Sequence, residues 1–311
     1  MINLGTMILT GCPFSGIKGV NDAIENSKSN ILLHVSDIEY CSLNELIVNG
    51  SSYLHSEIKS SYIRYPYDLI PPFTSDYSKR EAIEYHKSVA LLFDNCAINK
   101  LASTWQLRNR QFSLLQYKKH GGDIVETYLL NDHKYLNSKK KYIVKSIGNC
   151  YVSEELTDVN NDIFSVERDG EDIATIFPAQ QFDLDNAGKY FNLVDHVLIQ
   201  ERIEGKELRV HVIGKDVFLL ERQKVAGVDQ STGDFSFYKA EFNLDKIYHP
   251  IRSMMSEFNL DYLCFDLIMQ EGSDRPFVID INPYGSLPPT SEFPEHTNAL
   301  SQLLISRHDN L

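Results

Sequence analysis

The sequence has no excess of basic residues and no long apolar run. Its 311 residues include 43 Asp and Glu against 30 Lys and Arg, so the formal net charge is −13. Proteins that bind duplex nucleic acid usually present a basic face, so nucleic acid is not an expected partner. No stretch reaches the roughly 18 apolar residues of a membrane-spanning helix, so no membrane partner is expected either.

Motifs that would indicate secretion or a cysteine-based metal site are also absent. The first residues, MINLGTMILTGCPFSG, lack the basic segment and cleavage pattern of a secretion signal. No two cysteines have CxxC spacing, and their number is odd; they are Cys12, Cys41, Cys96, Cys150 and Cys264. Free thiols in a reducing cytosol are the simplest interpretation, which predicts a cytoplasmic protein.

What is present is a hydrophobic content of 42%, enough for ordinary globular cores in a chain long enough for several domains. The first hundred residues alternate between strand-like and helix-like patterns, which predicts an α/β domain over 1–98 with a partly parallel sheet. The predicted strands cover 6–11, 30–36 and 60–68, and the predicted helices cover 16–27 and 79–97.

The rest of the chain predicts two α+β lobes, over 99–196 and 197–311. The first has a helix stopped by two glycines, two strands and a polar loop, at 109–122, 123–132, 141–148 and 149–171. The second has a strand, a hairpin, an amphipathic helix and another hairpin, at 196–203, 206–225, 244–260 and 261–285. A tail over 286–304 begins as a loop and ends as a short helix.

The second hairpin carries polar residues inside apolar strands. Asp266 interrupts DYLCFDLIM, and Asp280 and Asn282 interrupt FVIDINPYG. If the EGSDRP loop closes the hairpin, the two carboxylates lie across from each other and Asn282 adds a third oxygen. Each aspartate alone could face solvent or cap a turn, but the three oxygens together favour an Mg²⁺ site.

Two further segments carry candidate ligand-binding residues. In LIQERIEGKELRV, Gln200, Glu201 and later Glu207 and Arg209 follow an apolar strand, an arrangement that can offer backbone groups to an adenine and a carboxylate to a ribose. An exposed polar hairpin explains this segment about as well. Lys145 lies in the apolar strand KYIVKSIG; a buried lysine needs an anion, although a strand-end lysine reaching water is the simpler interpretation.

The order of these motifs resembles the ATP-grasp superfamily, over roughly residues 100 to 290. A strand lysine comes first, then Q-E-x-I-x-G-x-E-x-R, then an apolar strand with Asp, and last the most specific segment, DINPYG. Within the superfamily the sequence looks most like the microviridin (graspetide) type of ribosomal-peptide maturase, with ribosomal-protein glutamate ligases as relatives. The resemblance implies an amino-terminal α/β domain and two lobes that bind ATP between them.

The resemblance also implies a role for each matching residue. Nucleotide and phosphate contacts fall on Arg110, Lys145, Gln200, Glu201, Ile203 and Glu207, with Lys145 holding phosphates and Glu207 the ribose. Arg209 would lie near the transferred phosphate and the acyl-phosphate, and Arg222, in LLERQKV, is a further candidate anion contact. Asp266, Asp280 and Asn282 would bind Mg²⁺, or Mn²⁺. The sequence departs from the family at Arg110, where lysine is common, and at Asp280, where many members have glutamate.

The implied reaction is an ADP-forming ligation through an acyl-phosphate, which joins a carboxylate to an amine or a hydroxyl. The substrate would be a peptide or an amino acid, and the aromatic, proline-rich start of 60–100 suits an extended peptide, although ordinary packing explains it as well. A ligase for small metabolites, a non-catalytic nucleotide-binding module and a kinase variant stay as alternatives. Many relatives are dimers, so a homodimer is possible, and the 149–171 loop is a candidate lid.

Overall fold

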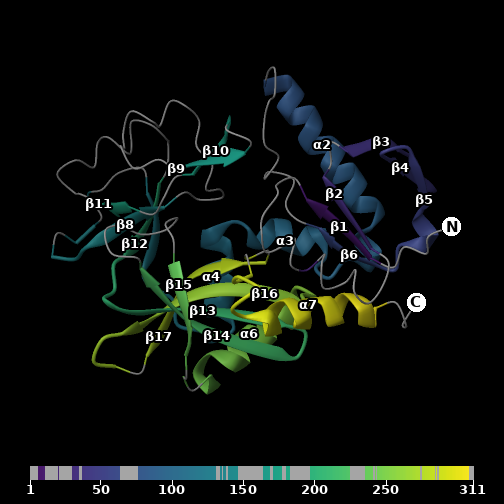
Figure 1. Ribbon diagram of the computed structural model, residues 1–311. Coiled ribbons are helices and arrows are strands. Elements are labelled where there is room, and N and C mark those ends of the chain that lie inside the picture. Colours follow the sequence, from purple (N-terminus) through teal and green to yellow (C-terminus); the bar gives the residue numbers. More distant parts are fainter. Residues whose placement is uncertain are drawn as a thin grey trace.

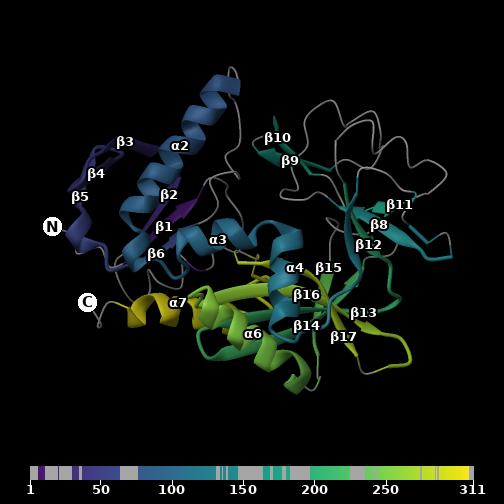
Figure 2. The same ribbon diagram turned by 180° about the vertical axis from the view of Figure 1, so that it is seen from behind.

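In the computed structural model the chain forms three parts, and each part contains at least one β-sheet (Figure 1). The amino-terminal part, in purple and blue, and the central part, in teal, both lie against the carboxyl-terminal part, in green and yellow, and the view from behind agrees (Figure 2). The structure describes residues 6–10, 20, 30–34, 37–63, 76–130, 134, 136–137, 139–145, 164–168, 171–176, 180–182, 197–224, 235–240, 242, 244–273, 275–283, 285 and 287–307.

The amino-terminal part contains the parallel sheet that the sequence predicted. Its order is β2-β1-β6, and both outer strands run parallel to β1. The strands are β1 (Thr6–Thr10), β2 (Asn30–His34) and β6 (Ser60–Ile63). The helix predicted over 16–27 lies outside the described residues, except that Val20 is helical and buried.

A second, antiparallel sheet in this part was missed by the sequence patterns. It contains β3 (Ile38–Cys41), β4 (Glu45–Val48) and β5 (Ser51–Leu54), followed by the 3₁₀ helix η2 (His55–Glu57). The turn between β4 and β5 is Asn49-Gly50, both with positive φ, which is the tight-turn signal that could have revealed the hairpin. Both sheets share one buried cluster with the helix α2 (Asp76–Leu92).

The helix predicted over 79–97 is too long, because α2 ends at Leu92. The polar residues that follow form the 3₁₀ helix η4 (Asp94–Cys96). There the Asp94 carboxylate accepts a hydrogen bond of 2.7 Å from the Leu101 N–H, at the start of α3 (Leu101–Leu107). The Asp94 side chain thus satisfies an N–H group in the first turn of α3 that has no acceptor within that helix.

The central part is an antiparallel sheet in the order β11-β8-β12-β7. Its strands are β7 (Thr127–Leu130), β8 (Tyr142–Lys145), β11 (Gln180–Phe182) and β12 (Val197–Glu201). The prediction of a loop over 149–171 is wrong in part, because an antiparallel hairpin, β9 (Phe164–Arg168) and β10 (Glu171–Ile176), begins inside it. The sequence between these strands is Asp169-Gly170, a typical hairpin dipeptide; 149–163 lies outside the described residues.

The carboxyl-terminal part is a five-stranded antiparallel sheet in the order β15-β14-β13-β16-β17. Its strands are β13 (Gly205–Ile213), β14 (Asp216–Lys224), β15 (Phe235–Lys239), β16 (Tyr262–Gln270) and β17 (Pro276–Asn282). Both predicted hairpins are confirmed.

Helices pack against both faces of this sheet. The helices α4 (Arg110–Lys119) and α6 (Asp245–Glu257) bury one face with Leu114, Met254 and Phe265. The helix α7 (Pro294–Ser306) contacts the other face near Cys264. The Asn109 side chain caps α4 by accepting from the Phe112 N–H at 2.9 Å.

Two composition-based expectations can be compared with the described part of the chain. Cys41, Cys96 and Cys264 are free thiols, as predicted, whereas Cys12 and Cys150 lie outside the described residues. Among the described residues, no helix has both the length and the apolar character to cross a membrane.

Candidate active site

Three adjacent strands bring the predicted metal and phosphate residues side by side. Arg209 on β13 pairs with Asp266 on β16, and Asp266 pairs with Asp280 on β17. The pairing shifts between Asp266 and Leu267, because Leu267 pairs with Val278 and leaves Ile279 as an extra residue in β17. This β-bulge lets Asp280 face the same side of the sheet as Asp266, while Val278 still packs into the core on the opposite side.

Arg209 and Asp266 form a two-point ion pair on this face. The Arg209 Nε donates to Oδ1 of Asp266 at 2.7 Å, and Nη2 donates to Oδ2 at 2.9 Å. Both side chains are largely buried, with 18% and 10% of their surface exposed. Burial by itself lowers the pKa of Arg209, but the neighbouring groups, with Asp266 first among them, together outweigh it, so the pKa is raised and the guanidinium stays charged.

Arg222 connects the same carboxylate to Glu207. Its Nη1 donates to Oε1 of Glu207 at 2.8 Å and to Oδ2 of Asp266 at 3.4 Å. Arg222 comes from β14 and Glu207 from β13, so the ion pair crosses neighbouring strands. The sequence prediction that Arg222 is an anion contact therefore names a residue that lies directly beside the predicted metal ligands.

Arg110, at the start of α4, binds the other carboxylate. Its Nε donates to Oδ1 of Asp280 at 2.9 Å, and both side chains are partly exposed. Three arginines and three carboxylates thus meet on one face of the sheet, so their formal charges balance. We refer to this set as the arginine–carboxylate network; its members are Arg110, Arg209, Arg222, Glu207, Asp266 and Asp280.

A pocket of about 380 Å³ lies at one end of the network. Its wall combines the apolar side chains of Ile203 and Ile268 with the charged side chains of Glu207 and Arg222. Most of the other lining residues are also charged or polar, so Ile203 and Ile268 provide the apolar surface of this pocket. Ile268 was not predicted from the sequence, although it is two residues from Asp266 on β16.

The predicted adenine hinge joins the central sheet to the carboxyl-terminal sheet. Gln200 is fully buried, and its Nε2 donates to the Ile279 carbonyl oxygen at 3.2 Å, so it contacts the bulge of β17. Glu201 accepts from Lys140 Nζ at 2.8 Å, and its N–H donates to the Glu126 carbonyl. Ile203, two residues further, is the one of these three residues that lines the pocket.

Lys145 is the last residue of β8 and pairs with Leu198 on β12. Its backbone is therefore in the central sheet, whereas its side chain lies outside the described part of the structure. Its predicted contact with phosphates stays a prediction.

Asn282 ends β17, two residues beyond Asp280, and is exposed. Asp280 and Asn282 therefore offer hard oxygen donors at the strand end, beside the buried Asp266. Within the described residues, no group of three or more His, Cys, Asp or Glu side chains is arranged as a metal site. The predicted set has two carboxylates and an amide, and this donor chemistry fits a hard cation such as Mg²⁺.

A search against protein-family models finds no match for the sequence, and a search of curated proteins finds no relative. The chain nevertheless has the ATP-grasp fold, because solved ATP-grasp ligases match it over nearly its whole length. This confirms the fold that the order of motifs implied.

Three of these solved structures illustrate the similarity. The macrocyclase MdnC of Microcystis aeruginosa MRC, bound with the precursor peptide MdnA, has a TM-score of 0.73 and 15% identity, covering 97% of this chain and 99% of that one. A RiPP-associated ATP-grasp ligase of Chryseobacterium gregarium, in complex with ADP and a leader and core peptide, has a TM-score of 0.69 and 15% identity, covering 98% and 97%. The ATP-grasp ligase PsnB, complexed with a phosphomimetic variant of its minimal precursor, Mg and ADP, has a TM-score of 0.70 and 12% identity, covering 99% and 100%.

Proposed function

We propose that the chain is an ATP- and Mg²⁺-dependent ligase that joins a peptide carboxylate to an amine or a hydroxyl group, releasing ADP and phosphate. The observation that carries this proposal is the arginine–carboxylate network beside a pocket lined by Ile203, Glu207 and Ile268. The ATP-grasp fold supports it, as do the nucleotides and precursor peptides named for the similar structures.

The pocket supplies groups that suit a nucleoside. Ile203 and Ile268 give apolar surface for a base, and the Glu207 carboxylate can accept hydrogen bonds from ribose hydroxyls. Glu207 is already oriented by Arg222 at 2.8 Å, so little side-chain freedom is lost when a ligand binds.

The network supplies cations and hard oxygen ligands for the phosphates. Asp266, Asp280 and Asn282 would hold Mg²⁺, which neutralises phosphate charge and orients the phosphates. Arg209 and Arg110 contact these carboxylates in the described structure, and the planar guanidinium is a group that suits phosphate oxygens. Lys145 is the additional cation that the family resemblance implies.

The reaction has two steps. An oxygen of the substrate carboxylate attacks the γ-phosphorus of ATP, the bond from phosphorus to the bridging oxygen breaks, and ADP leaves. The amine or hydroxyl then attacks the acyl carbon, the carbon–oxygen bond to phosphate breaks, phosphate leaves, and the attacking group loses its proton. Positioning and charge neutralisation provide most of the acceleration, and Arg209 is the residue that we assign to the negative charge at the transferred phosphate.

Several finer proposals rest on the sequence patterns and on the family resemblance. The domains would divide at 98 and 196, the compartment would be the cytoplasm, and a homodimer is possible. The segment 149–171 would exclude water from the acyl-phosphate, in which case its deletion uncouples ATP turnover from ligation.

Trapping the acyl-phosphate tests the proposed chemistry. The protein is incubated with MgATP, a pool of short acidic peptides and hydroxylamine, and peptide hydroxamates are detected by mass spectrometry. We expect hydroxamates that require ATP and disappear in Asp280→Ala. Hydroxamates on free amino acids alone would favour the small-metabolite alternative, and phosphorylated peptide without any hydroxamate would favour a kinase.

A further inference from the structure

The segment that links the amino-terminal part to the carboxyl-terminal part passes through Asn99, which is 5% exposed. Just before it, Ala97 forms a parallel bridge with Ser61, and the Ile98 N–H donates to the Ser61 carbonyl at 2.9 Å. Asn99 itself forms an antiparallel bridge with Leu260, just before β16. Asn99 therefore lies where the first parallel sheet and the five-stranded sheet meet.

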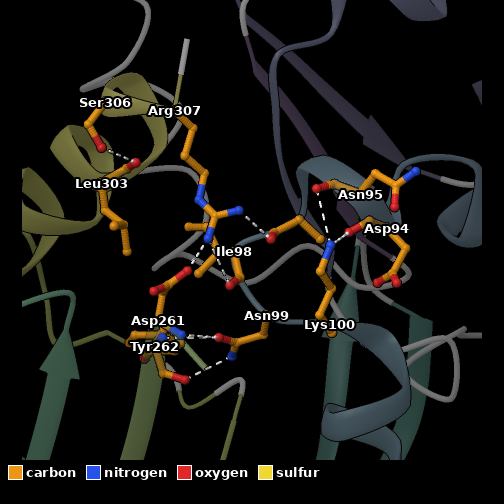
Figure 3. Close-up of polar contacts among 11 residues, drawn as sticks. Asp94, Asn95, Ile98, Asn99, Lys100, Asp261, Tyr262, Leu303, Ser306 and Arg307 are labelled. Atoms are coloured by element: carbon orange, nitrogen blue, oxygen red, sulfur yellow. Dashed lines mark hydrogen bonds and ion pairs between the residues drawn. The ribbon is translucent and has the colours of Figure 1, made fainter. Parts of the chain in front are cut away.

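The Asn99 side chain uses both of its donors and both of its acceptor positions, and Figure 3 shows its bonds to Asp261 and Tyr262. Its Oδ1 accepts from the Asp261 and Tyr262 N–H groups, each at 3.0 Å. Its Nδ2 donates to the Tyr262 carbonyl at 2.8 Å and to the Pro283 carbonyl at 2.9 Å. A buried amide with four partners has one orientation, because any rotation breaks several hydrogen bonds.

The bond to Pro283 joins Asn99 to the turn that follows β17. The pairing of β16 with β17 ends where Cys264 meets Asn282, and Pro283 has no N–H with which to continue it. Beyond that point the turn is fixed by Asn99 at Pro283 and by the Tyr262 hydroxyl, which donates to the Gly285 carbonyl. Gly285 packs so closely on the Cys264 side chain that any Cβ would overlap it.

We propose that Asn99 is a positioning residue that fixes the end of β17, and with it the Asn282 amide, in the geometry that completes the divalent-cation site. The inference rests on the proposed function, because it takes Asn282 as a cation ligand. Asn282 is the exposed member of the three predicted ligands and lies at a strand end, so its position depends on the residues that hold the next peptide group.

Arg307 provides a matched control at the same junction. It donates from Nη1 to the Ala97 carbonyl at 2.7 Å and from Nη2 to the Ile98 carbonyl at 3.4 Å, and it also pairs with Asp261 (Figure 3). Its substitution removes contacts between the same two parts of the molecule, but no contact with the turn after β17. A general weakening of this junction would therefore appear in both variants, whereas loss of positioning would appear only at Asn99.

The test compares Asn99→Ala, Asn99→Asp and Arg307→Ala with the wild-type chain. Asn99→Asp keeps the two acceptor positions and replaces the donors to Tyr262 and Pro283 with an oxygen, so it is a second, independent loss of these two hydrogen bonds. Calorimetry measures ADP affinity with and without Mn²⁺, and hydrogen exchange measures protection of the peptide over 279–287. Thermal unfolding of all four proteins checks that they are folded.

We expect both Asn99 variants to lose roughly ten-fold in Mn²⁺-dependent ADP affinity, the effect of about one net hydrogen bond, and to exchange faster over 279–287. The ADP affinity of both Asn99 variants without Mn²⁺ should stay within about two-fold of the wild-type value. Arg307→Ala should have ADP affinities within about two-fold of wild type both with and without Mn²⁺. If the Asn99 variants keep the wild-type Mn²⁺-dependent ADP affinity, or if Arg307→Ala loses as much of it as they do, the positioning role is overturned while the proposed function stands. A wild-type chain that binds no Mn²⁺–ADP would overturn the proposed function itself.

Discussion

Each predicted carboxylate ligand contacts an arginine in the described structure. Asp266 binds Arg209 and Arg222, and Asp280 binds Arg110. Buried or half-buried carboxylates on one sheet face would repel each other, so they need cations close by when no metal is bound. The sequence identified all five residues as site candidates, but it assigned the arginines to phosphate and did not anticipate their pairing with the metal ligands.

The two-point ion pair between Arg209 and Asp266 can be tested with a substitution that changes its geometry and keeps its charge. Arg209→Lys keeps one positive charge but cannot donate two parallel hydrogen bonds to Asp266. We expect kcat for peptide-dependent ADP release to fall about 100-fold, as when one transition-state donor is removed. Steady-state kinetics would measure it.

Arg275→Lys is the matched control. Arg275 makes the same kind of two-point ion pair with Asp123, at 2.9 and 2.7 Å, but on an exposed surface outside the network. Its kinetics should match the wild type. If Arg209→Lys has the wild-type kcat, Arg209 contributes only its positive charge and not its two-point geometry.

A buried histidine should make stability depend on pH. Burial lowers the pKa of His296, which is 1% exposed, from its usual 6.5 to about 4. Well above pH 6.5 the ring is neutral in both the folded and the unfolded state, so it adds no pH dependence there. As the pH falls from about 6.5 to about 4, the unfolded chain gains the proton first, and the folded state loses relative stability.

At pH 5 this histidine should cost about 2 kcal/mol of unfolding free energy relative to pH 7.5. His296→Phe removes the titrating group, so its unfolding free energy should fall by about 2 kcal/mol less than that of the wild type between pH 7.5 and pH 5. Urea unfolding at both pH values would measure this difference. If both proteins lose the same unfolding free energy between pH 7.5 and pH 5, His296 does not titrate as inferred.

At the scale of elements, strand register decides which side chains share a face. Alternation in the sequence correctly predicted both hairpins and the pairing of Asp266 with Asp280. It could not reveal the bulge at Ile279, because the carbonyl of that residue is bound by Gln200 from the central part, 79 positions earlier in the chain. It also missed α3, β15 and the β3–β5 sheet, whose short segments carry little periodic pattern of their own.

The start of β13 depends on a glycine. A Cβ on Gly205 would overlap the backbone carbonyl of Met269 in the neighbouring β16, and backbone cannot move aside as a side chain can. Gly205→Ala should therefore lower the free energy of unfolding by about 1–3 kcal/mol. Denaturant unfolding would measure the change.

Lys206→Ala is the control for that substitution. Lys206 is the next residue of β13, is exposed, and should change stability by less than about 0.5 kcal/mol. A Gly205→Ala protein as stable as this control would mean that β13 and β16 can separate locally at little cost.

At the scale of the whole molecule, the candidate site lies in the carboxyl-terminal part, beside its junction with the central part. The network combines α4 with four strands of the five-stranded sheet, and the pocket lies where β12 leads into β13. The order of motifs along the chain was sufficient to imply the ATP-grasp fold, because that order reflects how the sheets follow one another. The substrate could not be inferred in the same way, because ATP and Mg²⁺ contacts do not specify which carboxylate and acceptor bind beside them.

The most direct test of the central claim is to identify the nucleotide products formed from MgATP, with and without a pool of short acidic peptides. The proposed ligase should release ADP and phosphate only when a suitable peptide is present, and Asp280→Ala should abolish that release. AMP and pyrophosphate would instead mean adenylation of the substrate and would contradict the acyl-phosphate mechanism.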